Sequence, residues 1–323
     1  MDQDHILKEN KTISEILASG LSNGYIIVLG GVNVDICGKP VNTLVPADSN
    51  PGKISISFGG VGRNIAHNLA LMNTDVRFMT AVGNDFYGKK LLDSLSSLGI
   101  EHSHSIVISD ALTSSYLFIT DTEGEMVLAV SDMDIYDHVS VSYLMENIDF
   151  LSAASLIVAD TNIPQESIEW LADNVNVPIL IDTVSTAKAL KIKNIIGKLH
   201  AIKPNKIEAE LLSGIKITDT ESLKNAANVL LNTGLSEVFI SLGSEGVYAA
   251  NHSEHLKLDC LPSNLKNVNG GGDAFMAGVA FAKLCGLSLK DTARFALAAS
   301  SVAVESSETI SPNMCLDSVL EKL

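Results

Sequence analysis

A run of three glycines followed by an aspartate stands near the end of the chain, in the stretch NVNGGGDAFMAG (267–278). Small and apolar residues continue from there at helical spacing as far as Gly286, so the glycines are predicted to form the loop and first turn of a helix. N–H groups at a helix N-terminus lack partners within the helix and attract anions, and glycine leaves them unshielded. Asp273 would repel a resting phosphate, so we expect it to accept a proton from a hydroxyl that attacks the phosphate.

The same stretch also has a purely structural interpretation, which stays open at this point. An aspartate in a first helical turn is favoured by the helix dipole, and glycines allow close packing against a neighbour. No Lys-Ser/Thr pair follows the glycines, as it does in a P-loop. Neither this stretch nor VLGGVNVD (28–35) has the GxGxxG spacing of dinucleotide-binding proteins, so hydride transfer on a dinucleotide cofactor lacks support.

The composition limits the partners that the chain can take. Its 323 residues are 46% apolar and 19% charged, which is typical of a globular protein with a substantial core. The net charge of -16 opposes binding to a polyanion, so no polynucleotide partner is expected. No apolar run is long enough to cross a membrane, and the charged first twenty residues do not resemble a signal peptide. The four cysteines form no CxxC pair, which favours reduced thiols and a cytoplasmic location.

Apolar runs alternate with helical patterns along most of the chain. Runs that are apolar on both faces and joined by helices predict parallel strands covered on both sides, a doubly wound α/β fold. The six runs are residues 25–30, 76–83, 156–160, 178–183, 200–205 and 237–243. Residues of about 36–58 and 113–131 have strand patterns without a following helix, so we expect them to form a small β-sheet lid. Residues 1–24 are predicted to form a polar, amphipathic appendage, and residues 25–323 are predicted to form one domain.

Six segments, in the same order along the chain, resemble the PfkB/ribokinase family of carbohydrate and nucleoside kinases. They are LGGVNVD (29–35), FGGVGRNIAHNLA (58–70), AVGNDFYG (81–88), KPNKIE (203–208), SLGSEG (241–246) and NVNGGGDAFMAG (267–278). Six ordered matches are far more specific than any one of them. The resemblance implies a ribokinase-like fold and an enzyme that uses ATP and Mg²⁺ to phosphorylate a hydroxyl of a sugar or nucleoside. Two residues depart from the family, because Asn269 stands where Thr or Ser is usual and Gly271 where Ala is frequent.

The resemblance also implies which residues are catalytic and which hold the metal. Asp273 stands at the position of the family's base. The amides implied to stabilise the transferred phosphoryl group are those of Gly270, Gly271 and Gly272. Asn205 and Glu208 match the residues that organise Mg²⁺, largely through water, although the pair alone also fits a helix N-cap and a glutamate favoured by the dipole. Potassium near the glycine loop is a further cofactor of many relatives.

Binding residues for the nucleotide and the substrate follow from the same matches. The positions implied to lie beside the nucleotide are Ser241, Gly243 and Gly246, with residues 298–300 and Asn313 as candidates for the adenine pocket. The positions implied to bind the substrate are Asp35, Gly59, Gly60 and Asn64, with Asn33, Ser115, Tyr116 and Asn162 as further candidates. A carboxylate suits a neutral sugar because it accepts two hydroxyl protons, although Asp35 also fits an Asx turn at a strand end.

The substrate is narrowed by resemblance within the family. The stretch ADSNPGKI (47–54), with the segments that follow it, is most similar to pseudouridine kinases, which implies phosphorylation of the 5′-hydroxyl of pseudouridine. Ribose, adenosine and a sugar phosphate are the competing substrates, and the last would need more basic residues than Lys53 and Arg63. A non-catalytic nucleotide or sugar sensor is the alternative from another class. Free edges of a lid sheet would also favour a homodimer formed through the lid.

Overall fold

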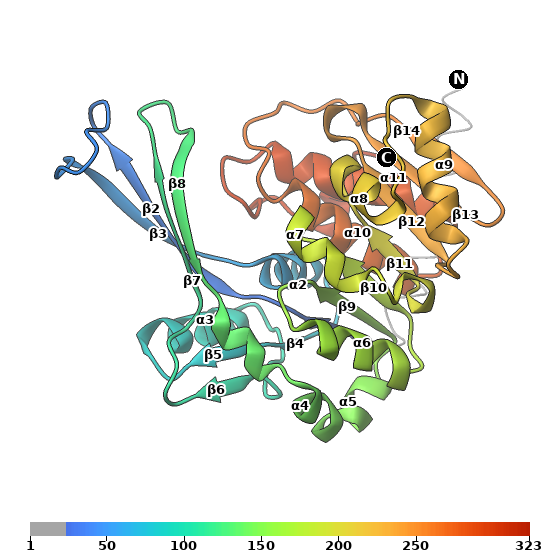
Figure 1. Cartoon of the computed structure of the whole chain (residues 1–323), viewed down its shortest axis with the longest axis horizontal. Helices are drawn as coiled ribbons and strands as arrows, with labels where there is room; N and C mark the ends of the chain where they lie inside the picture. The colour runs from blue at the N-terminus through green and yellow to red at the C-terminus, as the bar shows by residue number, and fades with distance from the viewer. Residues whose placement is uncertain (1–23) are drawn as a thin grey trace.

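The computed structural model describes residues 24–323, so the predicted N-terminal appendage lies outside the described residues except for Gly24. Eight strands form a large sheet in the order β14-β13-β12-β11-β10-β9-β1-β4 (Figure 1). The strands from β4 to β12 are parallel, and β13 and β14 form an antiparallel edge. Their bounds are β1 Ile26–Leu29, β4 Val76–Met79, β9 Leu156–Asp160, β10 Ile179–Asp182, β11 Ala201–Lys203, β12 Glu237–Ser241, β13 Val247–Asn251 and β14 His255–Leu258.

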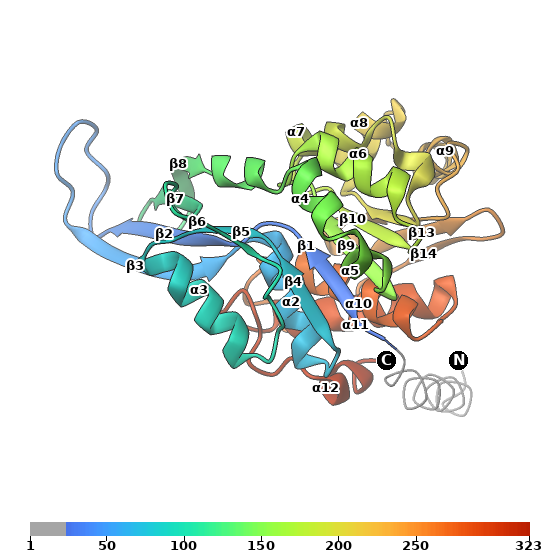
Figure 2. The same ribbon diagram turned by 90° about the horizontal axis from the view of Figure 1, so that it is seen from below.

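Helices cover both faces of this sheet (Figure 2). On one face lie α2 (Val61–Leu71), α10 (Gly271–Leu284), α11 (Leu289–Val304) and α12 (Leu316–Leu320). On the other lie α4 (Val141–Glu146), α6 (Gln165–Asn174), α7 (Thr186–Ala189), α8 (Lys206–Ser213) and α9 (Thr220–Leu231). Strand β1 shows why helices must cover both faces, because its successive side chains point to opposite sides. Ile26 packs into one apolar core and Ile27 into the other, and both are fully buried. The predicted doubly wound fold is therefore confirmed.

The predicted strand at 76–83 forms two strands in two different sheets. Residues 76–79 form β4, and β5 (Ala81–Gly83) pairs instead with β6 (Ile106–Ile108) in a separate two-stranded sheet. The reason is that β1, the only neighbour of β4 in the large sheet, ends at Leu29, opposite Met79. Short helices join the remaining parts: α3 Phe86–Ser97, η1 Asp134–His138, α5 Ile148–Ser152, η2 Leu190–Ile192, η3 Ile196–Lys198 and η4 Gly243–Glu245.

A four-stranded sheet projects from the β1–β4 side of the molecule (Figures 1 and 2). Its order is β3-β2-β7-β8, with the bounds β2 Asn33–Pro40, β3 Gly52–Gly59, β7 Ser115–Thr120 and β8 Met126–Asp132. These strands come from the two regions in which the sequence predicted a small sheet. Strand β2 begins at Asn33, three residues earlier than predicted, so Asp35 lies inside a strand rather than in a loop.

The two faces of this small sheet differ in character. Residues in register on neighbouring strands share a face of the sheet. Ile36 is in register with Ile56 on β3 and with Leu117 on β7, and Leu117 is in register with Val130 on β8. The outer face therefore gathers apolar side chains that are more than 40% exposed, namely Ile54, Ile56, Leu117, Leu128 and Val130. The opposite face carries Asp35 beside Ser57 and Tyr116.

Across residues 24–323, no helix is both long and apolar enough to span a membrane.

Candidate active site

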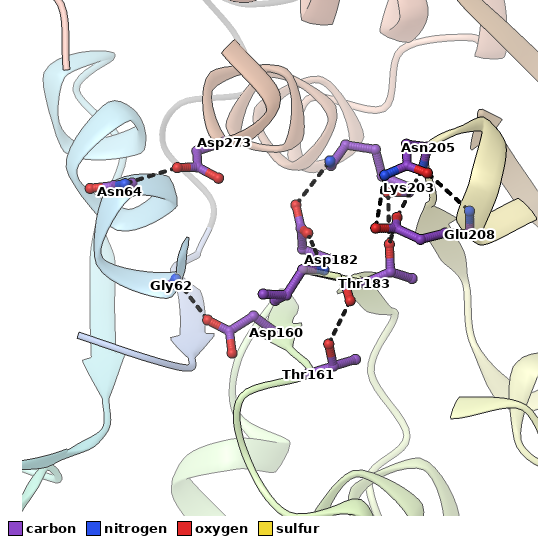
Figure 3. Close-up of polar contacts among 11 residues, drawn as sticks. Gly62, Asn64, Asp160, Thr161, Asp182, Thr183, Lys203, Asn205, Glu208 and Asp273 are labelled. Carbon is purple, nitrogen blue, oxygen red and sulfur yellow. Dashed lines mark hydrogen bonds and ion pairs between the residues drawn. The ribbon is translucent and has the colours of Figure 1, made fainter. Parts of the chain in front are cut away.

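Polar residues collect where the central strands of the large sheet end. Asp160 ends β9, Asp182 ends β10, Lys203 ends β11 and Ser241 ends β12. Parallel strands present their carboxyl ends at one edge, and the strand order reverses at β1, which is where ligands bind in open α/β sheets. Helix α10 brings Asp273 to the same edge (Figure 3). The fold thus brings together residues that are more than one hundred positions apart.

The glycine loop forms the first turn of α10, as the sequence predicted. Gly270 is the N-cap residue with φ +80°, a left-handed conformation, and a Cβ there would overlap the carbonyl oxygen of Thr309. Gly271 already donates a long hydrogen bond of 3.4 Å from its N–H to the carbonyl oxygen of Val268. Gly272 is exposed, so an anion has access to this turn. The loop therefore has the geometry of an anion-binding helix start.

Asp273 is the third residue of α10 and is partly buried. Its Oδ2 accepts a hydrogen bond of 2.8 Å from Nδ2 of Asn64, in α2. Burial, with repulsion by Asp182, raises the pKa of Asp273 to about 7, although the bond from Asn64 and the charge of Lys203 act to lower it. A carboxyl group with a pKa near neutrality is well suited to accept a proton from a substrate hydroxyl.

A buried ion pair, which the sequence analysis missed, lies next to this helix start. Nζ of Lys203 lies 3.1 Å from Oδ2 of Asp182, and the two side chains are only 11% and 5% exposed. Burial acts to lower the pKa of Lys203, but the attraction and hydrogen bond of Asp182, together with the charges of Asp273 and Glu208, outweigh it and the pKa is raised. Nζ also lies 3.5 Å from the position that a Cβ on Gly272 would take. A permanent positive charge therefore stands beside the glycine amides, and its place in the KPNKIE segment was the only signal in the sequence.

The chain is strained just after β10. Val184 has φ +58°, which is unfavourable for a β-branched residue. Its N–H donates to Oδ1 of Asp182 over 2.9 Å, and the preceding Thr183 donates from Oγ1 to Oε2 of Glu208 over 2.6 Å. The strained turn thus fixes both Asp182 and Glu208 in place.

Asn205 and Glu208 form a capping box at the start of α8. Asn205 Oδ1 accepts from the N–H of Glu208, and Glu208 Oε2 accepts from the N–H of Asn205, each over 2.9 Å. Oε1 of Glu208 also accepts from Nδ2 of Asn205, so both carboxylate oxygens already have donors. Among the described residues, no group of three or more His, Cys, Asp or Glu side chains is arranged to hold a metal. Because both oxygens of Glu208 already accept hydrogen bonds, the pair suits contact with Mg²⁺ through the waters of the ion.

A cavity of about 360 Å³ lies between α10, α11 and the loops after β12 and β14. The predicted nucleotide-binding residues Ser241, Gly243 and Gly246 line it together with Lys203 and the glycine loop. Its walls are mainly apolar, formed by Leu261, Leu265, Val268, Phe275, Leu297 and Val304. This combination suits a flat heterocycle with phosphates directed at the helix start. Ser300 also lines the cavity, but Asn313 does not and instead borders a separate cavity near α12.

Asp35 lies on the inner face of the small sheet, with polar neighbours. Nδ2 of Asn33 donates to its Oδ1, and Gly59 backs it so closely that a Cβ there would overlap Oδ2. Burial raises the pKa of Asp35 to about 6, while the bond from Asn33 and the charge of Arg63 act to lower it. Asn64, the next residue along α2, donates a hydrogen bond to Asp273, so α2 connects the small sheet to Asp273.

The remaining predicted substrate residues differ in how they are placed. Gly60 is the N-cap of α2 with φ +98°, and a Cβ on it would overlap the carbonyl oxygen of Gly31. The amide of Asn162 lies 2.8 Å from the position of a Cβ on Gly31, at the carboxyl end of β1. Ser115 is in register with Val34, so its side chain lies on the opposite face of the small sheet from Asp35. Tyr116, the other candidate in this strand, is in register with Asp35 and lies on the same face of the small sheet.

Comparisons with known proteins identify the family of this chain. The sequence pattern of the pfkB family carbohydrate kinases matches residues 23–314. A pseudouridine kinase of Escherichia coli (strain K12) is 38% identical over 92% of this chain and 95% of its own length. An uncharacterized sugar kinase of the same organism is 36% identical over 92% of this chain and 82% of its own length.

Solved structures have the same fold. A carbohydrate kinase from Agrobacterium tumefaciens superimposes with a TM-score of 0.83 at 28% identity, over 93% of this chain and 97% of that one. A ribokinase from Thermotoga maritima superimposes with a TM-score of 0.81 at 24% identity, over 92% and 98% of the two chains. The second likeness is one of fold alone.

Proposed function

The chain belongs to the pfkB family of carbohydrate kinases and is a phosphotransferase, and on this premise we propose that it transfers the terminal phosphoryl group of ATP to the 5′-hydroxyl of pseudouridine. The observation that carries the proposal is the position of Asp273, bonded to Asn64 beside the glycine loop that lines the cavity. The choice of pseudouridine is supported by the 38% identity to the Escherichia coli pseudouridine kinase.

The proposed reaction proceeds in line at the first turn of α10. The 5′-oxygen forms a bond to the terminal phosphorus, the bond from that phosphorus to the bridging oxygen of ADP breaks, and Asp273 takes the hydroxyl proton. Amides of the glycine loop and the ammonium of Lys203 stabilise the charge that develops on the phosphoryl oxygens. Asn205 and Glu208 would hold Mg²⁺ through its waters, and the ion would supply positive charge that offsets the charge of the phosphates.

Substrate recognition is proposed for the inner face of the small sheet and the start of α2. Asp35 accepts hydrogen bonds from two ribose hydroxyls, and Asn33, Gly59 and Gly60 shape the floor beneath the ring. Closure of the small sheet over the nucleoside excludes water, which would otherwise compete as the phosphoryl acceptor. Asn162 and Tyr116 are the proposed contacts to the base.

We also propose that two copies of the chain associate through the small sheet. Its outer face exposes Ile54 by 77% and Val130 by 59%, and exposed apolar patches of this kind mark interaction sites. We propose a second copy of the same face as the partner, because that face is apolar too and would bury these side chains without burying charge.

Potassium dependence is proposed for the glycine loop, which packs against the segment containing Thr309.

A coupled assay for ADP tests the proposed activity. Purified protein with ATP and Mg²⁺ is given pseudouridine, uridine, ribose and adenosine in turn, with and without potassium, and the product is identified by mass spectrometry. We expect the highest kcat/KM with pseudouridine and a product phosphorylated at the 5′ position. A higher kcat/KM with ribose or adenosine would reassign the substrate within the family. Ligand binding without ADP from any acceptor would instead support the non-catalytic sensor.

A further inference from the structure

We propose that Arg63 is a positioning residue that sets the orientation of the Asn64 amide and thereby connects the small sheet to Asp273. This inference rests on the proposed function, because it assigns Asp273 the role of base. Arg63 is the third residue of α2, and its backbone N–H donates to the carbonyl oxygen of Gly31 over 3.0 Å. This bond fixes the backbone of Arg63 beside Gly31, between β1 of the large sheet and β2 of the small sheet.

The guanidinium of Arg63 holds two acceptors on different elements. Nη1 donates over 3.1 Å to the carbonyl oxygen of Phe58, the residue before the last of β3. It also donates over 3.3 Å to Oδ1 of Asn64. Its charge also acts on Asp35 in β2, whose pKa it lowers. A single side chain thus contacts the root of the small sheet and the residue that binds Asp273.

The contact with Asn64 matters because the two ends of an amide are chemically different. Asp273 accepts from Nδ2 of Asn64, and a rotated amide would turn Oδ1 toward the carboxylate and repel it. A guanidinium can only donate, so Arg63 binds Oδ1 and leaves Nδ2 free for Asp273. Only one of the two amide orientations satisfies both neighbours.

Groups on several neighbouring elements change the pKa of Asp273. Asp182 in β10 and Asp160 in β9 raise its pKa, as does burial, whereas Asn64 in α2 and Lys203 in β11 lower it. Loss of the bond from Asn64 would leave the raising effects less opposed. The base would then hold its proton to a higher pH and be inactive over more of the neutral range.

The carbonyl of Phe58 gives this arrangement a further consequence. It lies just before Gly59 and Gly60, where the chain leaves β3 and enters α2. A shift of β3 when the nucleoside binds against Asp35 would move one acceptor of Arg63 and alter its hold on Asn64. Occupancy of the small sheet would in this way be transmitted to the base.

The experiment measures the pH dependence of kcat for wild type, Arg63→Met and Arg63→Lys, with the acceptor that gives the highest rate. The acidic limb of kcat reports the base in the ternary complex. We expect Arg63→Met to move this limb upward by about half a unit to one unit, with kcat largely restored at pH 9. Arg63→Lys keeps the charge near Asp35 but loses the planar fork, so we expect a smaller shift in the same direction.

Asn64→Ala supplies the matched background. If Arg63 acts through Asn64, Arg63→Met should cause no further shift of the limb in the Asn64→Ala protein. A fall in kcat that is equal at all pH values, or a rise in KM alone, would overturn the proposal in favour of a structural role or an effect on Asp35 alone. If Arg63→Met fails to fold, the position of the acidic limb of kcat in Arg63→Lys tests the proposal instead. Wild type that makes no ADP with any acceptor would refute the proposed function itself, whereas an active wild type with an unmoved limb in the variants would refute only the role of Arg63.

Discussion

The nucleotide side of the site and the small sheet are built on opposite principles. Lys203 and Asp182 are paired and almost wholly buried, on two strands, β11 and β10, that each have a neighbouring strand on both sides. The small sheet exposes most of β3, including Ile54 at 77%, and no helix formed by residues 24–323 lies along its outer end (Figure 1). The charges that we propose act on phosphate are therefore held in place before any ligand binds, whereas Asp35 is carried by a sheet with little core of its own. We expect substitutions on the nucleotide side to act on kcat and stability, and those on the small sheet to act on KM and association.

The largest effect is expected for Asp273→Asn. Loss of the base should lower kcat by about 10²–10⁴-fold, while the KM for ATP changes little. In wild type, kcat should fall as the pH drops below about 7, because Asp273 becomes protonated. The measurement is kcat against pH for both proteins with the same acceptor. Near-normal turnover in the variant would remove Asp273 from the role of base.

Stability provides the control for that variant. The pKa of Asp273 is raised in the folded state, so the stability it contributes is present below the unfolded pKa of 3.8 and is lost as the pH rises through about 7. Asp273→Asn has no such titration and should be more stable than wild type at pH 8. Urea unfolding at pH 5 and pH 8 measures the difference, and an inactive variant that is also less stable at pH 8 would contradict this account.

Lys203→Met is expected to have the next largest effect. It removes a charge beside the transferring phosphoryl group, and we expect kcat to fall by about 10²-fold. It also leaves Asp182 buried and unpaired, which should cost about 3–5 kcal/mol of unfolding free energy. The double variant Lys203→Met, Asp182→Asn should recover stability but not activity. Recovery of both would mean that Lys203 acts only as a structural partner.

Asp35→Asn tests the small sheet. Removal of a charged acceptor of two hydroxyl groups should cost about 1.5–3 kcal/mol in nucleoside binding, seen as a rise in KM of roughly ten- to one hundredfold. The value of kcat should change less than tenfold. Asp48→Asn, in the exposed loop between β2 and β3, is the control with the same change in charge. Equal kinetics for the two variants would mean that Asp35 does not contact the substrate.

The smallest effect on turnover is expected for Ile56→Lys. A charge on the outer face of the small sheet should turn a dimer into a monomer, seen by light scattering after size exclusion, with kcat within about twofold of wild type. Ser55→Lys, on the same strand but the opposite face, serves as the control. A wild type that is already monomeric at micromolar concentration would rule out association through this face.

Local patterns in the chain were sufficient to predict several elements of the fold and site. The helix start at Gly270–Asp273 and the Asn205–Glu208 pair depend on residues within four positions of one another, so their geometry follows from backbone rules. The buried strands were also predictable, because a run that is apolar on both faces must be covered on both. Of these runs, residues 76–83 were wrongly predicted to form a single strand. The segment itself does not show that its partner β1 ends opposite Met79.

The amino-acid sequence by itself therefore determined the doubly wound fold, the glycine-rich helix start and the aspartate beside it, because each depends on short-range periodicity or on backbone groups next to one another. Only the tertiary structure decided that Lys203 pairs with Asp182, that Tyr116 rather than Ser115 faces the side of Asp35, and that Arg63 contacts both Phe58 and Asn64. These contacts depend on strand register and on the direction in which each side chain leaves its element. A shift of one residue reverses the face of a strand, and no local pattern specifies it.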